Sequence, residues 1–495
     1  MNNKQSVGLG TNAAMLSFSN IFSLLISMLS AMLLSRYTNT YEYGTYSQIL
    51  LSTGLAISIF TLGMPNSVNF FLPRAESIQE KQIFVNIYYL SISGVCLLCG
   101  LVLVLSLPFL KQYFHNDGLV HFWYILLLLP LTRIIIQSNS NLLVVLEKTK
   151  LLLVYTFLYN LALLLIVLAI KLFQLSFSLY LVLYIIIQMA FTCIAYWFAW
   201  HYLDVRINTL LKNLWPNFIL TFVRILKFSV PLGLGGMVAT LSLELDKLVI
   251  ANLMDTNHLA IYSNASKELP IAMLISSFTA VLLPKISKML KDNKYKEAFT
   301  LWGKTTEIGV NIMSFFTISI ITFAPQIIVF LYSDKYIQGS MVFAICTLIL
   351  LMRSTYFGII LNVSGNTKFV FYSSLVSLLL NFALNYVFYS IFGFSGPAIA
   401  TVLSIALVNA LQLMYTSKIS KISIKQIFPW KNIAILIMRN ILLALPFIAI
   451  KLVLQLQTGT KDIIISMAIG LIWLIAFVIT NKKKLLDGWK YLNTY

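Results

Sequence analysis

The segment YILLLLPL, residues 124–131, decides the fold class because it is apolar throughout, with no alternation of polar and apolar residues. A strand of a membrane β-barrel would alternate with a period of two over about ten residues. The apolar run extends outward to residues 119–145, which as a helix is long enough to cross about 30 Å of hydrocarbon. The segment therefore predicts a transmembrane helix.

The remainder of the chain repeats this pattern. Of its 495 residues, 59% are hydrophobic and only 10% are charged, and the mean hydropathy is +0.87. So much apolar surface cannot be buried inside a water-soluble globule. The apolar runs predict an all-α integral membrane protein with about fourteen spans, near residues 14–36, 45–71, 84–110, 119–145, 151–173, 178–202, 226–252, 261–285, 308–333, 340–363, 369–392, 395–416, 433–454 and 462–481.

The basic residues indicate the orientation of these spans. The formal net charge is +19, but no basic tail or stripe of the kind that binds nucleic acid is present. If both termini lie in the cytoplasm, most Lys and Arg residues fall in inner connections, as the positive-inside rule requires. The outer segments then hold only Arg36, Lys111, Lys171, Lys335, Lys451 and Lys461. We therefore expect a multi-pass protein in contact with membrane lipids and no nucleic-acid partner.

A weak internal repeat relates the two halves of the chain. Five short matches occur in the same order in both halves, and they align Tyr46 with Tyr262, Pro73 with Pro284, Arg133 with Arg353, Thr149 with Thr367 and Asn160 with Asn381. Six spans per half is an even number, so the halves would be parallel repeats with a central cleft between them.

This repeat predicts the domain organisation. We expect a first six-helix bundle (1–203), an interfacial cytoplasmic linker (204–225), a second six-helix bundle (226–417), two additional transmembrane helices (432–481) and a cytoplasmic tail (482–495).

Charged residues within spans are the candidate site, because a charge at the bilayer centre costs about 2.5–3.5 kcal/mol and should face protein or water. Arg133 and Arg353 occupy matching positions, and Gln137 and Asn141 continue a polar stripe from Arg133. A guanidinium forks onto phosphate or carboxylate oxygens, so we expect these residues to bind an anion. The alternative is a structural pairing with a carboxylate, or with backbone at a helix break near Pro130.

The seventh span contains LSLELDKL, which carries Glu244, Asp246 and Lys247. Asp246 or Glu244 is the candidate site for a coupling ion, either a proton or sodium. Lys267 is a candidate substrate contact, although it could instead pair with the neighbouring Glu268 or snorkel to the interface.

No catalytic pattern stands out. There is no GxxxxGK phosphate loop, HExxH or Ser/His/Asp set, so we expect a protein that is not an enzyme. Cys96 and Cys99 have CxxC spacing, but they lie in the apolar run SGVCLLCGL without partner ligands. We therefore expect no metal and no cofactor.

The chain resembles the polysaccharide exporters of the multidrug/oligosaccharidyl-lipid/polysaccharide (MOP) superfamily, especially Wzx-type O-antigen flippases. The resemblance covers nearly the whole chain and is carried by the order of LLSRYTNTYEYGTYSQ (33–48), GMPNSVNFFLPR (63–74), the stretch LKFSVPLGLGG to SNASKELP (226–270) and VLLPKIS (281–287).

The resemblance implies a MATE-like, fourteen-span bundle with a V-shaped cleft. It also implies flipping of undecaprenyl-diphosphate-linked oligosaccharide repeat units to the outer leaflet of the bacterial inner membrane, for O-antigen in lipopolysaccharide or a related polysaccharide. By position, Arg133, Arg353, Lys247 and Asp246 would line the cleft, and Arg36 is the basic residue of the first two spans.

Other functions remain open at this point. They are a cation-coupled multidrug antiporter of the same superfamily, a flippase for lipid II, and a membrane-embedded polysaccharide polymerase or glycosyltransferase. The antiporter would require acidic residues in the first half of the cleft, and the enzymes would require a sizeable outer loop. A repeat-unit flippase would work beside polysaccharide polymerase machinery.

Overall fold

The computed structural model describes residues 9–203, 207–267 and 269–493. Every regular element in these ranges is a helix, which confirms the all-α fold class. The chain divides into two compact units. Unit 1 comprises residues 1–244 and 251–260, and unit 2 comprises residues 245–250 and 261–495.

Unit 1 contains the first ten elements and most of a long helix that follows them. The elements are α1 (Leu9–Tyr37), α2 (Thr40–Thr61), α3 (Asn66–Phe71), η1 (Leu72–Arg74), α4 (Ile78–Leu105), α5 (Leu107–Tyr113), η2 (Asp117–Phe122), α6 (Trp123–Val145), α7 (Thr149–Phe173), α8 (Phe177–Leu203) and the first part of α9 (Ile207–Leu253). The start of α10 (Thr256–Ala265) also belongs to this unit.

Unit 2 contains the rest of α10 and the remaining helices. They are α11 (Ala272–Lys291), α12 (Tyr295–Thr322), α13 (Ala324–Tyr332), η3 (Asp334–Gly339), α14 (Ser340–Thr347), α15 (Ile349–Met352), α16 (Ile359–Val363), α17 (Thr367–Phe392), η4 (Gly393–Ser395), α18 (Gly396–Ser420), α19 (Ile424–Ile427), α20 (Trp430–Val453) and α21 (Thr460–Asn493).

The described helices support a multi-pass membrane protein. Ten helical segments are long and apolar enough to cross a bilayer, or eleven if α2 is counted together with α3 and η1, which are bent by 41° from it. One of the ten, Thr367–Ser420, contains both α17 and α18. The predicted count of fourteen spans is therefore not confirmed, although the polytopic helical architecture is.

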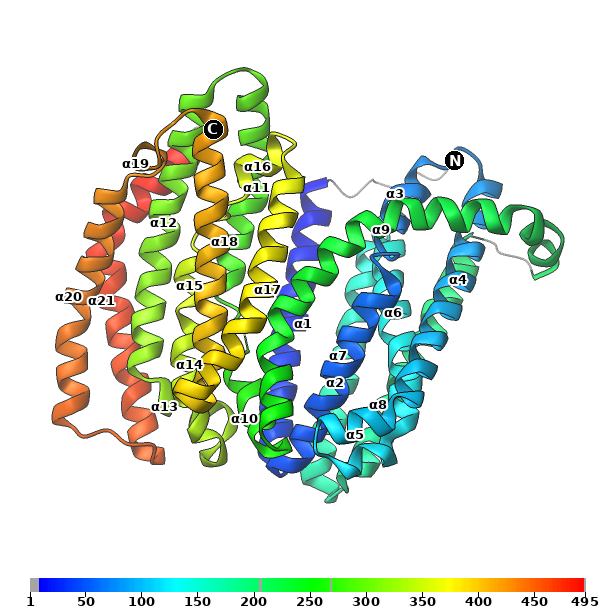
Figure 1. Ribbon diagram of the computed structural model, residues 1–495, viewed down its shortest axis with the longest axis horizontal. Helices are drawn as coiled ribbons and strands as arrows, with labels where there is room; N and C mark the ends of the chain where they lie inside the picture. The colour runs from blue at the N-terminus through cyan, green and yellow to red at the C-terminus, as the bar shows by residue number, and fades with distance from the viewer. Residues whose placement is uncertain (1–8, 204–206, 268, 494–495) are drawn as a thin grey trace. The chain divides into compact units, whose positions relative to one another are not determined.

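Helix α9 joins the predicted linker (204–225) to the predicted seventh span (226–252). It is continuous over 47 residues, from the predicted linker through the whole predicted seventh span. Figure 1 shows that α9 bends, so that its first part runs across the end of α4 in unit 1. The boundary between the two compact units falls within this helix, after Glu244.

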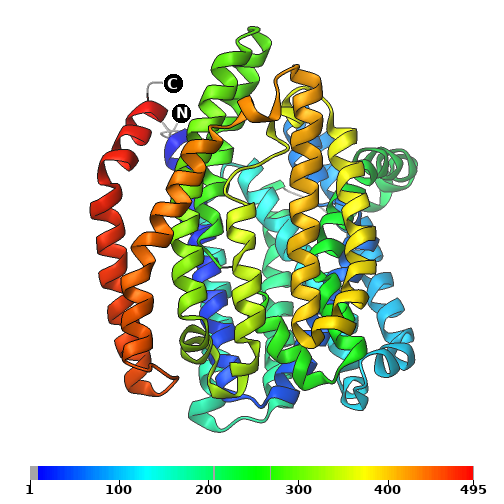
Figure 2. The same ribbon diagram turned by 60° about the vertical axis from the view of Figure 1, so that its left-hand side comes forward.

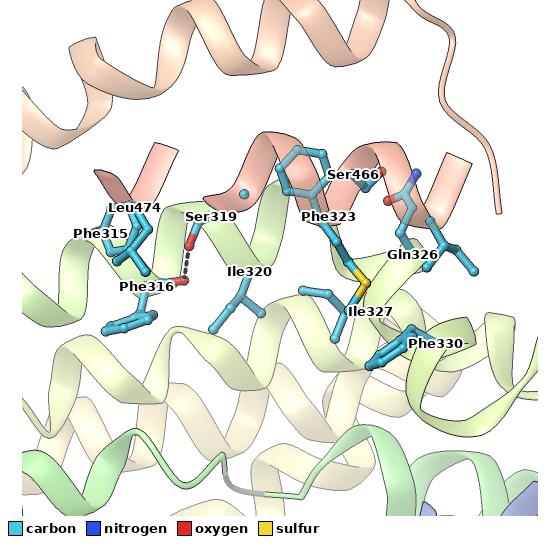
Figure 3. A pocket seen from close by; sticks show the side chains of 13 residues that line it. Phe315, Phe316, Ser319, Ile320, Phe323, Gln326, Ile327, Phe330, Ser466 and Leu474 are labelled. Carbon is cyan, nitrogen blue, oxygen red and sulfur yellow. Dashed lines mark hydrogen bonds between the residues drawn. The ribbon is translucent and has the colours of Figure 1, made fainter. Parts of the chain in front are cut away.

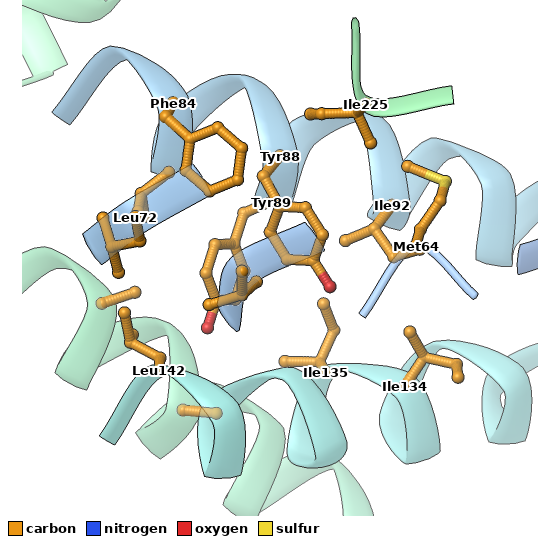
Figure 4. Packing of buried hydrophobic residues seen from close by; sticks show 14 of the residues in the cluster. Met64, Leu72, Phe84, Tyr88, Tyr89, Ile92, Ile134, Ile135, Leu142 and Ile225 are labelled. Atoms are coloured by element: carbon orange, nitrogen blue, oxygen red, sulfur yellow. The ribbon is translucent and has the colours of Figure 1, made fainter. Parts of the chain in front are cut away.

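The core of unit 1 lies between α4 and α6. Phe84, Tyr88 and Ile92 on α4 pack with Ile134 and Ile135 on α6 (Figure 4). Because lipid tails are as apolar as these side chains, close packing and hydrogen bonds stabilise such a contact more than removal from water does.

A small residue and a hydroxyl pair bring these two helices together. A Cβ atom on Gly100 would lie 2.1 Å from the backbone oxygen of Leu127, so glycine is what permits this approach. The hydroxyls of Tyr88 and Ser138 are hydrogen-bonded at 2.6 Å.

The last two helices belong to unit 2. Helices α20 and α21 pack against each other and against α12, as Figure 2 shows in orange and red. Asn311 of α12 donates to Asn481 of α21 at 2.9 Å. Asn440 of α20 donates to the backbone oxygen of Asn311, also at 2.9 Å. All three side chains are buried, so one asparagine of α12 ties both helices to the unit.

Candidate substrate and ion sites

Arg133 lies within α6, half-buried inside unit 1. Helix α6 runs through Pro130 without interruption, so the helix break predicted there is wrong. The side chains of Tyr46, Tyr159 and Tyr184 lie close enough to the Arg133 guanidinium to interact with it electrostatically. The surroundings of this arginine are therefore aromatic and hydroxylic.

These tyrosines come from three helices and contact one another. Tyr46 of α2 has its ring centroid 6.1 Å from that of Tyr184 and 6.3 Å from that of Tyr180, both on α8. Tyr159 is on α7. We refer to Arg133, Tyr46, Tyr159, Tyr180 and Tyr184 together as the Arg133 cluster.

The Arg133 cluster has the chemistry of an anion site. Among the described residues, no carboxylate pairs with Arg133. The guanidinium is always charged, and tyrosine hydroxyls also donate hydrogen bonds to oxyanions. An intramembrane cation that lies near tyrosine hydroxyls, and has no carboxylate partner among the described residues, therefore suits a phosphate or carboxylate ligand.

The two polar residues that follow Arg133 on α6 have different environments. Gln137 is exposed. Asn141 is half-buried, and its Nδ2 donates to the backbone oxygen of Pro65 at 2.9 Å. Since Pro65 lies between α2 and α3, Asn141 stabilises the bend between these helices. Of the two residues, only Gln137 has an exposed amide that continues the polar stripe from Arg133.

A second cluster in unit 2 is built around Asp246, whose side chain is 3% exposed. Its Oδ2 accepts a hydrogen bond of 3.0 Å from the Tyr262 hydroxyl, and its Oδ1 accepts one of 2.8 Å from the backbone N–H of Lys247. Lys247 and Asp246 also interact electrostatically with Cys346. The structure thus brings two of the predicted charges together.

Lys267 lies close to the same cluster. Its ammonium donates to Asn264 at 2.9 Å, lies 6.0 Å from the ring centroid of Tyr332 and interacts electrostatically with Lys247. We refer to Asp246, Lys247, Tyr262 and Lys267 as the Asp246 cluster. The suggested partner Glu268 is outside the described residues.

The other predicted residues lie elsewhere. Arg353 is half-buried directly after α15, where the tenth predicted span is divided into α14, α15 and α16. Arg36 is exposed in the last turn of α1. Glu244 is half-buried on α9 and belongs to unit 1, whereas Asp246 belongs to unit 2. Convergence of Arg133 and Arg353 on one substrate stays a prediction.

The tyrosines of the two clusters were not predicted as site residues. One signal was present, because the repeat aligns Tyr46 with Tyr262. In the structure, α2 begins at Thr40 and α10 at Thr256, and each tyrosine is the seventh residue of its helix. The equivalent tyrosines therefore face a guanidinium in unit 1 and a carboxylate in unit 2.

An apolar crevice of about 210 Å³ lies between α12, α13 and α21 in unit 2 (Figure 3). Phe315, Phe323 and Phe330 line it, together with Leu474. Its polar groups are few, among them Gln326, whose Nε2 is engaged by the backbone oxygen of Leu456 at 3.0 Å. The crevice suits an apolar chain.

Comparison with protein families gives two matches. The family model described as "Polysaccharide biosynthesis protein" matches residues 9–290, which is more than half of the chain. The model described as "Lipid II flippase MurJ" matches residues 157–472.

Curated relatives match in part. The chain is 22% identical to the capsular polysaccharide biosynthesis protein CapF of Staphylococcus aureus, over 43% of this chain and 54% of that one. It is 25% identical to the probable low-salt glycan biosynthesis flippase Agl15 of Haloferax volcanii, over 44% of this chain and 46% of that one. The chain spans about half the length of the curated relatives it matches.

Solved structures share the fold. The lipid II flippase MurJ in an inward closed conformation superposes with a TM-score of 0.68 at 16% identity, covering 94% of this chain and 98% of that one. A multidrug resistance MATE family transporter in an inward-facing conformation gives 0.63 at 14% identity, covering 83% and 99%. The MATE-like fold is therefore confirmed.

Proposed function

The chain belongs to the polysaccharide biosynthesis protein family of the MOP superfamily, and from this premise we propose that it flips an undecaprenyl-diphosphate-linked oligosaccharide repeat unit across the bacterial inner membrane. The repeat unit is that of O-antigen or a related surface polysaccharide, and it moves from the inner to the outer leaflet by alternating access. Family membership indicates a transporter and not an enzyme.

The Arg133 cluster carries this proposal. A diphosphate brings several anionic oxygens into the membrane, and each must keep hydrogen-bond partners while it crosses. Arg133 supplies a permanent positive charge, and the hydroxyls of Tyr46, Tyr159 and Tyr184 supply further donors. Arg353, Lys247 and Lys267 of unit 2, and Arg36 in the last turn of α1, are the further positively charged residues that we propose contact the substrate.

The apolar crevice supports a lipid-linked substrate. A polyprenyl chain can remain in hydrocarbon or lie against Phe315 and Phe323, while only the sugars and phosphates need a polar path. Outward movement of the anion also runs down an inside-negative membrane potential, which is worth about 2.3 kcal/mol per charge per 100 mV.

Substitution of the two arginines tests the proposal. In a strain without its own copy, we expect Arg133→Ala with Arg353→Ala to abolish surface polysaccharide and to leave the protein at normal abundance in the membrane. Arg133→Lys keeps the positive charge but not the paired N–H donors of the guanidinium, so this variant should retain partial export. Lys171→Ala, at the exposed end of α7, is the matched control and should export normally. Normal polysaccharide in the double variant would remove both arginines from the site.

We further propose that Asp246 or Glu244 binds the coupling ion, which is either a proton or sodium. Asp246 is a buried carboxylate, and a carboxylate oxygen can take up a proton or bind a cation such as sodium. Asp246→Asn with Glu244→Gln should make flipping independent of the gradient of that ion. Unchanged dependence on both proton and sodium gradients in this variant would contradict the assignment.

The identity of the substrate is tested by the compound that accumulates in a strain without the protein. Loss of a repeat-unit flippase leaves the completed lipid-linked oligosaccharide on the inner leaflet, whereas loss of a multidrug antiporter raises drug sensitivity and leaves polysaccharide intact. Rescue of a strain that lacks its lipid II flippase would assign lipid II instead. Neighbouring glycosyltransferase and polymerase genes would support the repeat-unit assignment and cooperation with polymerase machinery.

A further inference from the structure

A polar pocket of about 540 Å³ lies in unit 1, separate from the Arg133 cluster. It is formed by the first part of α9, by Phe71 of α3 and by the segment that runs from η1 into α4. Arg74, Glu76 and Glu80 line it from this segment, and Thr221 and Arg224 line it from α9.

Two guanidiniums are held on adjoining aromatic rings at this pocket. Cζ of Arg74 lies 3.7 Å from the ring centroid of Phe70, and Cζ of Arg224 lies 5.1 Å from that of Phe71. The two ring centroids are 5.0 Å apart. Among the described residues, neither arginine forms an ion pair. Both positive charges are therefore available to one anionic group.

Two carboxylates line the same pocket. Both glutamates, Glu76 and Glu80, are exposed. Oε2 of Glu80 accepts a 2.9 Å hydrogen bond from the backbone N–H of Glu76, and this bond holds the Glu80 carboxylate beside Glu76. A ligand with negative charges alone would be repelled by this pair. A ligand that carries both a phosphate and an ammonium group complements all four side chains.

The surroundings of the pocket are apolar and exposed. Ile219 is 73% exposed and Leu220, which lines the pocket, is 74% exposed. Ile78, at the start of α4, is 70% exposed. The opposite face of this part of α9 is occupied, since Phe222 and Ile225 pack into the core of unit 1. A helix with one face on the protein and apolar side chains on another lies at a membrane interface.

We propose that this pocket binds a zwitterionic phospholipid of the phosphatidylethanolamine type. Arg74 and Arg224 bind the phosphate, Glu76 and Glu80 bind the ammonium group, and the acyl chains lie against Leu220 and its apolar neighbours. The distribution of Lys and Arg assigns this end of unit 1 to the cytoplasm, so the lipid comes from the inner leaflet. A free phosphate compound would gain nothing from the exposed apolar side chains.

Native mass spectrometry of the full chain in detergent, titrated with phosphatidylethanolamine or phosphatidylglycerol, tests the phosphate contact. We expect the wild type to bind phosphatidylethanolamine at least about tenfold more tightly than phosphatidylglycerol, and Arg74→Gln with Arg224→Gln to lose at least about tenfold in that affinity. Lys227→Gln is the control, since Lys227 is exposed on the same helix and does not line the pocket. Wild-type affinity in the double arginine variant would overturn the proposal.

The carboxylates provide a test that does not depend on loss of binding. Glu76→Gln with Glu80→Gln should bind phosphatidylglycerol more tightly than the wild type does, and should lose the preference for phosphatidylethanolamine. An unchanged preference, or a wild type without preference, would overturn the assignment of the ammonium site. Soluble glycerophosphoethanolamine should bind at least about tenfold more weakly than the lipid, and equal binding would show that the apolar surface plays no part.

Discussion

The Tyr262 hydroxyl donates a hydrogen bond of 3.0 Å to Oδ2 of Asp246, and the two side chains are both almost completely buried. Tyr262 is on α10 and Asp246 is on α9, so this bond ties the two helices together within unit 2. A buried carboxylate depends on such donors, because burial without hydrogen bonds is costly.

Removal of the tyrosine hydroxyl is the first prediction. Tyr262→Phe keeps the ring and deletes the donor, so we expect a loss of about 1–3 kcal/mol in the free energy of unfolding, with the carboxylate left one partner short. Denaturant titration in detergent measures it. In the Asp246→Asn background the same substitution should cost less, because a neutral amide needs the hydroxyl less. An equal loss of unfolding free energy in both backgrounds would show that the hydrogen bond does not stabilise the charged form of Asp246.

A second prediction concerns Asn116, which is 1% exposed near the end of α5. Its Oδ1 accepts from the Tyr41 hydroxyl at 2.6 Å, and its Nδ2 donates to Thr45 at 2.9 Å and to Gln48 at 2.6 Å. Asn116→Ala removes all three hydrogen bonds and leaves the buried Oε1 of Gln48 without this donor, so we expect a loss of about 2–3 kcal/mol in the same assay.

The matched control for Asn116 is its neighbour. Asp117 pairs with Lys111 at 3.0 Å, but these side chains are 86% and 47% exposed. Asp117→Asn should therefore cost less than about 1 kcal/mol. Similar losses in Asn116→Ala and Asp117→Asn would contradict the importance of the buried network.

A third prediction compares two glycines of α2. A Cβ on Gly44 would lie 2.1 Å from the backbone oxygen of Thr256, whereas a Cβ on Gly54 would meet nothing within 4 Å. Gly44→Ala should push α2 away from α10 and break the 2.7 Å hydrogen bond from Thr40 to Asn257. Gly54→Ala should stabilise the helix by about 0.5–1 kcal/mol.

Disulfide formation between cysteines placed at residues 40 and 257, in a chain whose four native cysteines are replaced, measures this separation. We expect the yield to fall sharply with Gly44→Ala and to stay unchanged with Gly54→Ala. An unchanged yield with Gly44→Ala would mean that the contact adjusts locally.

The fourth prediction concerns pH. Asp255 precedes α10 outside the predicted spans, and its Oδ1 accepts hydrogen bonds from the backbone N–H of His258 at 2.8 Å and from its ring at 2.7 Å. Although burial raises the pKa of the Asp255 carboxyl, the hydrogen bonds from His258 lower this pKa overall. The carboxylate therefore stabilises the fold above its unfolded pKa of about 3.9, and this contribution is lost as pH falls through the lower folded value.

Asp255→Asn keeps an oxygen acceptor for the helix cap but does not titrate. The stability difference between the wild type and this variant should be constant near neutral pH and should shrink when pH falls below about 4. Thermal unfolding at pH 7 and pH 3.5 measures both differences, and equal differences would show that the charge makes no contribution.

The membrane helices were predictable because hydropathy is a local property. The run around YILLLLPL became α6, with Arg133 inside it. The continuity of α9 was not predictable in this way, since composition changes near residue 226 while the helix does not. Backbone hydrogen bonds between residues four apart form equally well at an interface and in hydrocarbon, so a change in polarity marks a change of surroundings and not a helix end.

The environment of each charged side chain could not be predicted from the sequence. Arg133 could be identified as an intramembrane cation, but Tyr46, Tyr159 and Tyr184 come from three other helices, and only packing brings them together. The repeat held part of this information, because it paired Tyr46 with Tyr262. Neither tyrosine stood out, since aromatic residues make up 14% of the chain.

Asn311, whose buried amide donates to α21 and whose backbone oxygen accepts from α20, bears on how this architecture tolerates shortening. A chain cut before Trp430 would present this amide, and the aromatic surface of α12 around Phe315, directly to lipid tails that offer no hydrogen bonds. The final pair of helices therefore covers a surface of unit 2 that could not face lipid by itself.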